Sequence, residues 1–559
     1  MAMIEKKDIT IFCENNQIEK KYPFGTTLYD IYVDMQIYIG EDILGAVVNN
    51  ILKELDYMVY KPKVVNFIGY SNPAGRRMYE RSVSMILFKA VYDLYPQYKL
   101  KIEHSVSGGL YCELEGLKSK RSLPKIIVRL KERMKEIVAR DIPFEREEIR
   151  TEKALKIFEE FGLEDKCTLI KTRNQFFSSV YKLDNIVNYF YGFLVPSTGH
   201  LSRFDLVKYY NGMLLVLPSQ VNPEQFKHVV EKNKLFEIFQ EFKDWVEIIG
   251  VPNVGRLNEI TLAGNAGSII KVSEALQEKK IACIAEMIHK KKSVKVIFIS
   301  GPSSSGKTTF AKRLGIQLTV IGMKPQVISM DNYFVDREKT PRDENGNYDF
   351  ESPEALDIEL FNNNILNLIA GKEIDLPNFS FTEGKRFYNG TTLKLNTNGI
   401  IIVEGIHGLN PAISKLIPDN RKFKIYVSAL TPLSFDSINR IPTTDNRLLR
   451  RMVRDSRYRG YSAVETLKRW PSVRKGEEKY IFPYQEEADV MYNTALPYEL
   501  GVLKQWAEPL LRDVPPNAPE LSEARRLLKF LAYFARIGVR EIPPTSILRE
   551  FLNGSSFRY

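Results

Sequence analysis

Cysteine is scarce in this sequence. Four occur among 559 residues, Cys13, Cys112, Cys167 and Cys283, and no two of them form a C-x-x-C pair. Isolated cysteines argue against both a zinc knuckle and a disulfide framework. We therefore expect a protein of the reducing cytoplasm.

Long apolar runs are absent as well. No stretch approaches the 18 uninterrupted apolar residues of a membrane-spanning helix, and residues 1–8 lack the apolar core of a signal peptide. We predict neither membrane insertion nor secretion. A net charge of +11, from 80 Lys and Arg against 69 Asp and Glu, permits an anionic ligand and leaves nucleotide and RNA equally open. The length and an apolar fraction of 44% predict three or four globular domains.

The most informative stretch lies at residues 294–309. Residues 294–300 form an apolar run of β-branched and aromatic side chains with the length of a buried parallel strand. The next nine residues match G-x-x-x-x-G-K-[ST]; they are Gly301, Pro302, Ser303, Ser304, Ser305, Gly306, Lys307, Thr308 and Thr309. This order predicts a strand, a phosphate loop and a helix, with a chance match in a glycine-bearing turn as the alternative.

The residue types of this loop indicate a polyphosphate ligand. Gly301 and Gly306 let the backbone curl so that successive N–H groups face phosphate, and the helix that begins near Lys307 adds its positive end. Lys307 is expected to reach the β and γ phosphates of ATP. The Thr308 hydroxyl is expected to hold Mg²⁺.

Two acids follow apolar segments further along the chain. Asp331 comes after residues 326–330, and Glu404 comes after residues 400–403. A carboxylate at the C-terminal end of a parallel strand, beside bound phosphates, is where an acceptor hydroxyl needs a general base, so we predict that role for Asp331. A buried structural aspartate is the alternative. Glu404 is predicted to hold Mg²⁺ directly or through water.

Four arginines have helical spacing. Arg447, Arg450, Arg451 and Arg454 would share one face of a helix, and Arg459 follows closely. Because like charges this close repel one another unless an anion is present, we predict a lid that closes over the phosphates of ATP. A solvated basic helix and an RNA contact are the alternatives.

Taken in order, segments 301–309, 328–333, 348–353, 402–406 and 450–460 resemble the uridine kinase and phosphoribulokinase family. The resemblance covers about residues 293–512 and implies an α/β P-loop kinase with a parallel sheet flanked by helices, ATP as donor and Mg²⁺ as cofactor. It implies catalytic roles for Asp331, Lys307 and Arg454, with Arg451 and Arg459 as further lid residues. It also implies a set of acceptor contacts, which are Asp331, Tyr333, Asp349, Phe379, Arg386 and Arg451.

The departures from this family fall on the acceptor side. Uridine kinases usually show Pro-x-Tyr-Asp-Phe-x-x-His-x-Arg, whereas residues 377–386 place Phe379 at the tyrosine and Gly384 at the histidine. Tyr461 replaces a second arginine after Gly460. Losing a hydrogen-bonding partner changes specificity by large factors, while none of these changes touches the phosphate machinery. The predicted acceptor is a nucleoside or nucleoside-like hydroxyl compound, and another polyol or a sugar phosphate is the alternative.

The N-terminal half carries two other resemblances. Segments 9–13 and 18–22, a helix from Leu28, and strands at 46–50 and 64–68 resemble the TGS domain, a β-grasp module. Segments 79–82, 94–96, 108–111 and 195–200 resemble the second N-terminal domain of threonyl-tRNA synthetase, an α+β domain that hydrolyses mischarged tRNA.

The editing chemistry does not carry over. The synthetase pattern has two histidines, a cysteine and a later histidine where this chain has Arg81, Met85, Phe190 and Leu194. Arginine and apolar side chains neither bind a metal nor move a proton at neutral pH, so we predict an inactive editing fold. His104 and His200 are expected to be structural.

A basic helix is predicted inside this region, with Ser122 as its cap. Its apolar face comprises Ile127, Leu130, Met134 and Ile137. Its basic side chains are Lys125, Arg129, Lys131 and Arg133, which form either a solvated face or an RNA site.

The predicted division is therefore a TGS-like domain at 1–69, an editing-like domain at 70–225, a helical connector at 226–292, the kinase at 293–512 and a helical tail at 513–559. Helices are expected at 225–247, 268–291, 521–537 and 546–551, the last with Thr545 as its cap. No residue of the tail suggests chemistry. A third interpretation is a regulatory NTPase that contacts tRNA or another RNA through its N-terminal half, and homo-oligomerisation stays open.

Overall fold

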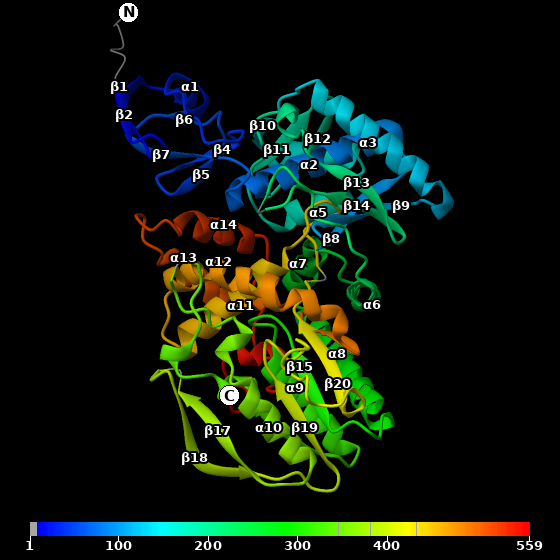
Figure 1. Ribbon diagram of the computed structural model, residues 1–559. Helices are drawn as coiled ribbons and strands as arrows, with labels where there is room; N and C mark the ends of the chain where they lie inside the picture. Colours follow the sequence, from blue (N-terminus) through cyan, green and yellow to red (C-terminus); the bar gives the residue numbers. More distant parts are fainter. Residues whose placement is uncertain (1–7, 221, 345, 381, 432) are drawn as a thin grey trace, which may run out of the picture.

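A five-stranded parallel sheet lies in the C-terminal half of the computed structural model, which describes residues 8–220, 222–344, 346–380, 382–431 and 433–559 (Figure 1). The prediction for the first seven residues lies outside these ranges. The strand order is β16 (Lys324–Ser329), β19 (Gly399–Glu404), β15 (Val296–Ser300), β20 (Lys422–Ser428) and β21 (Val490–Asn493). β15 pairs in parallel with both β19 and β20, so the central strand carries the predicted phosphate loop.

Alternate residues of the central strands face two different layers of helices. Ile297 and Ile299 of β15 pack in a core with α8 (Ala266–Lys290) and α9 (Lys307–Val320). Val296 and Phe298 pack on the other face with α10 (Ile358–Ile369). Period-two alternation of strand side chains produces this split, and covering both faces explains why β15 and β19 are buried throughout. The predicted α/β class is confirmed.

Further elements surround the sheet in the C-terminal half. An antiparallel hairpin, β17 (Ile374–Ser380) and β18 (Lys385–Leu393), projects beside α10 (Figure 1). Helices α11 (Thr443–Tyr458), α12 (Ala463–Tyr480), α13 (Glu499–Arg512) and α14 (Leu521–Leu531) lie between the sheet and the N-terminal half (Figure 1).

Residues 8–68 contain a mixed sheet in the order β2 (Ile18–Pro23), β1 (Asp8–Cys13), β7 (Lys63–Ile68), β4 (Gly45–Val48) and β5 (Ile51–Lys53). Helix α1 (Leu28–Asp34) begins where predicted because the Thr27 hydroxyl accepts from the Asp30 amide. A short ladder of β3 (Thr26–Thr27) and β6 (Met58–Val59) adjoins it. These elements suit the predicted TGS-like domain, which stays a prediction.

One predicted strand of this region ends earlier than expected. β4 stops at Val48, because Asn49 and Asn50 have φ angles of 46° and 59° and make the two-residue turn into β5. Asparagine tolerates left-handed backbone, so the pair Asn-Asn forms a hairpin turn and is not the end of a strand.

The next region is built from two antiparallel sheets and four helices. The sheets are β13 (Asp205–Tyr209), β14 (Gly212–Val216), β9 (Gly109–Glu115) and β8 (Lys99–Val106), and β10 (Glu145–Arg150), β11 (Phe177–Leu183) and β12 (Ile186–Asn188). The helices are α2 (Pro73–Leu94), α3 (Leu123–Ala139), α4 (Thr151–Glu160) and α5 (Glu164–Thr172).

Helix α3 has the predicted apolar face, since Ile127, Leu130, Met134 and Ile137 are buried. The predicted cap is wrong, because the Ser122 hydroxyl donates to the Ser119 carbonyl and accepts no helix amide. Two of the four basic side chains are already paired: Lys131 with Asp205 at 2.5 Å, and Arg133 with Asp93 at 2.8 Å.

The connector departs from its predicted outline. Residues 225–232 lie before α6 (Asn233–Ile249), and a separate helix, α7 (Val254–Leu262), starts inside the predicted break. It starts there because the Asn253 side chain accepts from the Arg256 amide. Helix α8 then packs on α9, and the Arg313 guanidinium donates to Glu278 Oε2 at 2.6 Å. The hydrophobic core therefore crosses residue 292, where a domain boundary was predicted.

The tail also differs from its prediction. Helix α14 ends at Leu531, six residues early, and the second element is a short 3₁₀ turn, Ile547–Glu550. Ser546 caps that turn in place of Thr545, because its hydroxyl accepts from the Leu548 amide. Within the described part of the chain, no helix combines the length and apolar character needed to cross a membrane.

A partly buried ion network joins α14 to the rest of the molecule. The Arg526 guanidinium contacts both Asp445 of α11, at 2.7 Å, and Glu523, which also binds Arg77 of α2 at 2.8 Å. Replacing Arg526 with methionine leaves the buried Asp445 without this cation, while Glu523 keeps Arg77, so we expect a loss of about 3 kcal/mol in the free energy of unfolding.

Chemical denaturation of the full chain measures this loss. The matched control is Arg525→Met, which changes the exposed neighbour. Equal stability of the Arg526 and Arg525 variants would contradict the role given to the network.

Candidate active site

The phosphate loop follows β15 with the predicted geometry. At Gly301 a Cβ atom would lie 1.9 Å from the Val427 carbonyl oxygen, so only glycine fits there. Gly306 has a φ of 83° and immediately precedes α9, whose first residues are Lys307 and Thr308. Strand, loop and helix are therefore arranged as the motif requires, with the first amides of α9 at the loop.

Three of the predicted site residues gather at the C-terminal edge of the sheet. Asp331 follows β16, Glu404 ends the adjacent β19, and Lys307 begins α9. Burial and the nearby Asp331 charge raise the pKa of Glu404 to about 7, while Lys307 acts in the opposite direction. Burial likewise raises the pKa of Asp331, against Lys307, Arg459 and Arg454. Two acids and several cations thus share one low-dielectric edge.

The acids fit a magnesium site of the kind that a phosphate loop builds. The Ser329 hydroxyl donates to Glu404 Oε1 at 3.0 Å, which orients this carboxylate, and Thr308 lies on the adjoining first turn of α9. Among the described residues no group of three or more His, Cys, Asp or Glu side chains could hold a metal. Mg²⁺ beside phosphates uses one or two protein oxygens, so Thr308 and Glu404 suffice as protein ligands.

The serines of the loop differ from one another. The Ser303 amide donates to Glu477 Oε1 at 3.2 Å, and its hydroxyl accepts from Arg451 at 3.0 Å. The hydroxyls of Ser304 and Ser305 are buried, and no hydrogen-bond partner of either is described. Protein groups therefore already engage Ser303, whereas Ser304 and Ser305 keep their hydroxyls available.

The four arginines with helical spacing lie on α11, which we call the arginine helix. They were predicted to repel one another in the absence of an anion, and two of them differ from this prediction. Arg447 and Arg450 are buried in ion pairs with Glu477 and Glu499, respectively. The Arg447 Nε also donates to the Ser303 carbonyl at 3.0 Å. The prediction is wrong for these two side chains because acids of α12 and α13 supply their anions. They hold the loop in place.

The remaining lid arginines share one acid. Asp455 contacts Arg451 at 3.2 Å, Arg454 at 2.8 Å and Arg459 at 3.6 Å. Arg454 and Arg459 are also among the cations whose charge lowers the pKa of Asp331. The structure thus brings the predicted lid to the predicted base.

The predicted acceptor residues have different environments. The Tyr480 hydroxyl donates to Asp349 Oδ2 at 3.1 Å, and Phe379 packs against Phe334. Arg386 pairs with Asp357 at 2.8 Å. Tyr333 is fully buried beside Phe361, and its hydroxyl accepts from Asn364, so the predicted acceptor contact of Tyr333 stays a prediction.

Two residues near Asp349 were not identified from the sequence. His407 is buried, no partner is described for either ring nitrogen, and burial lowers its pKa to about 4. Burial and Glu477 raise the pKa of Glu351 to about 7, and no partner is described for its Oε2. His407 lies three residues after Glu404, and that proximity to a strand end is the signal that could have found it.

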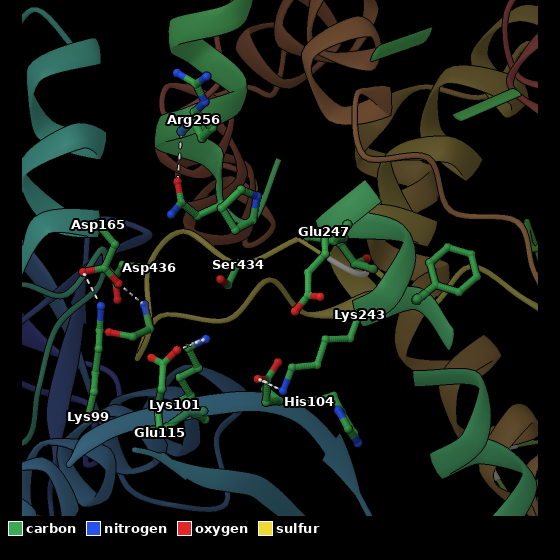
Figure 2. Close-up of a pocket in the computed structure, with 18 of the residues that line it drawn as sticks. Lys99, Lys101, His104, Glu115, Asp165, Lys243, Glu247, Arg256, Ser434 and Asp436 are labelled. Atoms are coloured by element: carbon green, nitrogen blue, oxygen red, sulfur yellow. Dashed lines mark hydrogen bonds and ion pairs between the residues drawn. The ribbon is translucent and has the colours of Figure 1, made fainter. Parts of the chain in front are cut away.

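A cavity of about 600 Å³ lies elsewhere, between β8, α6, α7 and residues 434–437 (Figure 2). Its lysines are all paired with acids: Lys99 with Asp165, Lys101 with Glu115, and Lys243 with Glu103 and with the neighbouring Glu113. None of the predicted site residues lines it. The ring of His104 stacks on Phe239 at 3.5 Å, which agrees with its structural interpretation.

The side chains at the four predicted editing positions are engaged in packing or hydrogen bonding within the protein. Met85, Phe190 and Leu194 are buried in one apolar core, and Arg81 donates to the Phe193 carbonyl at 2.8 Å. The prediction of an inactive editing fold rests on these side chains.

Comparison with known proteins agrees with this arrangement. Residues 296–497 match the model of the Phosphoribulokinase / Uridine kinase family. This match covers just over a third of the chain. A Staphylococcus aureus uridine kinase is 29% identical over 201 residues, which are 36% of this chain and 87% of that protein. The resemblance predicted for the C-terminal half is thus confirmed.

The N-terminal half has a different relative. A threonine–tRNA ligase of Clostridium kluyveri is 30% identical over 184 residues, which are 33% of this chain and 29% of the ligase. The chain therefore spans less than a third of that relative. A solved structure described as "a Possible Uridine Kinase from Bacillus stearothermophilus" aligns with 38% of this chain and 98% of its own, at 22% identity and a TM-score of 0.27.

The raised pKa of Glu404 predicts a pH effect on stability. A carboxyl group whose pKa is higher in the folded than in the unfolded chain binds more protons when folded between the two values, so stability falls as pH rises from about 4.5 to about 7. Glu404→Gln removes this effect, and we expect its gain in melting temperature over the natural chain to be larger at pH 8 than at pH 5.

Thermal melting at both pH values measures the gain. Glu373→Gln, a change at an exposed acid, is the control. An equal gain at both pH values would contradict the assignment.

Proposed function

We propose that the chain is an ATP- and Mg²⁺-dependent kinase that transfers the γ-phosphoryl group to a hydroxyl of a nucleoside-like small molecule. The observation that carries this proposal is the meeting of Lys307, Asp331 and Glu404 at one edge of the parallel sheet, beside the phosphate loop. The match of residues 296–497 to the model of a kinase family supports it.

Each of these residues has a part in the transfer. Lys307 and the amides at the start of α9 bind the phosphates. Thr308 and Glu404 would hold Mg²⁺, which would supply positive charge to the phosphoryl oxygens. Asp331 accepts the proton of the acceptor hydroxyl. The hydroxyl oxygen then bonds to the γ-phosphorus, while the bond between this phosphorus and the oxygen of the leaving ADP breaks. The raised pKa of Asp331 makes it a stronger base than an exposed aspartate. Arg454 and Arg459 shield the charge that develops.

The acceptor side favours an uncharged, hydroxyl-rich molecule. His407 is neutral because its pKa is about 4, and Glu351 and Asp349 are acids. A second phosphate on the acceptor would face these acids. We therefore favour a nucleoside-like acceptor over a sugar phosphate.

Pyrimidine recognition has less support. Gly384 has a φ of 70°, and a Cβ there would lie 2.7 Å from Arg337 Nε, so the position does not admit the histidine usual in uridine kinases. A uridine- or cytidine-like acceptor would therefore have to be held by other groups, and another polyol is the alternative acceptor.

A second candidate is a regulatory NTPase whose N-terminal half contacts tRNA. The likeness to a threonine–tRNA ligase supports it. The exposed Lys125 and Arg129 of α3 would be available for such a contact. We also propose a cytoplasmic location, with four free cysteines as support.

A screen of ATP turnover against nucleosides, polyols, sugar phosphates and tRNA separates these candidates. We expect a phosphorylated product with one nucleoside-like compound. Hydrolysis stimulated only by tRNA, without a phosphorylated small molecule, would decide for the regulatory NTPase.

Changing the base provides a sharper test. Asp331→Asn keeps the shape of the side chain but cannot accept the hydroxyl proton, so we expect turnover to fall by at least ~10² with nearly unchanged ATP affinity. Steady-state kinetics with the best acceptor of the screen and direct ATP binding measure the two effects. Asp375→Asn, at an exposed site on β17, is the matched control. Undiminished turnover in the Asp331 variant would remove it from the mechanism.

A further inference from the structure

The last residues of this chain lie against the phosphate loop. Ile547, Leu548, Phe551 and Leu552 are fully buried in the core that also holds Phe310 of α9. A Cβ at Gly306 would lie 2.6 Å from Ile547 Cγ2, so the segment touches the loop itself. Its position is fixed by apolar packing.

One acid of this segment occupies the start of α9. Glu550 Oε2 accepts from the Thr309 amide at 3.1 Å and from the Thr309 hydroxyl at 2.7 Å. The Tyr559 hydroxyl lies 2.8 Å from the same Thr309 hydroxyl. Thr309 is the third residue of α9, and its amide is one of the first four that have no partner within a helix.

The Thr309 amide is one of the backbone amides that bind the phosphates of a nucleotide in a phosphate loop. The amides of a phosphate loop and of the helix start after it hold the α and β phosphates, and a carboxylate is an alternative anion for the same donors. Burial lowers the pKa of Lys307, and the negative charges of Glu404, Asp331 and Glu550 oppose this shift, so Glu550 also lies near Lys307. The segment thus places a negative charge where a polyphosphate would bind.

The same segment contacts the lid. The Tyr458 hydroxyl of α11 donates to the Leu552 carbonyl, and the Arg450 guanidinium lies 5.0 Å from the centre of the Phe551 ring. On the outer side, Lys312 of α9 lies over the Tyr559 ring at 5.8 Å. Loop, lid helix and final segment therefore meet at Thr309.

We propose that residues 546–559 are an intramolecular competitor of the nucleotide, in which the Glu550 carboxylate takes the place of a phosphate on Thr309. ATP binds only when Glu550 turns away, so the apparent dissociation constant equals the intrinsic one divided by the fraction of molecules in which Thr309 is free. The buried apolar side chains of the segment hold it beside the phosphate loop even when Glu550 has turned away from Thr309. Only the side chain of Glu550 therefore has to move for the nucleotide to bind. This inference rests on the proposed use of ATP.

The test is direct binding of MgATP to the full chain by calorimetry. Glu550→Gln removes the charge at constant shape, and we expect the dissociation constant to fall by roughly tenfold or more, because a charge-assisted hydrogen bond and the repulsion of phosphate disappear together. Glu550→Ala should change affinity in the same direction. Melting temperatures establish that each variant is folded.

Glu541→Gln is the matched control. It removes one charge from the same part of the chain, where Glu541 pairs with Lys271 away from the loop, and should leave the affinity unchanged. Unchanged or weaker binding in folded Glu550 variants, while the natural chain binds MgATP, would overturn the competitor and leave the kinase proposal standing. If neither the natural chain nor any variant binds MgATP, both proposals fail.

Discussion

The site depends on buried ion pairs between helix α11 and the acids of α12 and α13. Arg447 and Arg450 are almost completely buried, and isolated charges in such surroundings would cost several kcal/mol each. Glu477 and Glu499 neutralise them, and the same guanidinium groups donate to the carbonyls of Ser303 and Thr494. The phosphate loop is therefore shaped by charges as well as by its glycines. Its backbone is held before any ligand arrives, which is what electrostatic preorganisation requires.

The arginine helix consequently has two functions. Its inner side chains are structural, whereas Arg451, Arg454 and Arg459 converge on Asp455 near Asp331. An acid shared by three cations leaves positive charge in excess. This excess of positive charge can attract a polyphosphate, and no buried side chain has to leave the core for that interaction.

The sequence predicted the phosphate-binding part of the site better than the acceptor part. Gly301, Lys307, Asp331 and Glu404 follow from local pattern, because strand ends and a loop motif determine where such side chains meet. The burial of Tyr333 could not be predicted, because it depends on packing against α10, which no local pattern contains. Glu477, Asp455 and Glu550 were missed since charged residues on helices are common, and only the folded chain shows which cation or amide each one meets. The start of α7 after Asn253 and the end of α14 at Leu531 were also not predicted, because capping and tertiary contacts determine them.

The core that crosses residue 292 has a consequence for how this architecture is built. Side chains of α4, α5, α7 and α8 share one apolar interior with the parallel sheet and with α14. A fragment cut before β15 would present to water the faces of β15 and α9 that α8 now covers. The synthetase-like and kinase-like halves are therefore not independent domains joined by a linker. Replacing either half would require a new apolar surface on the other half.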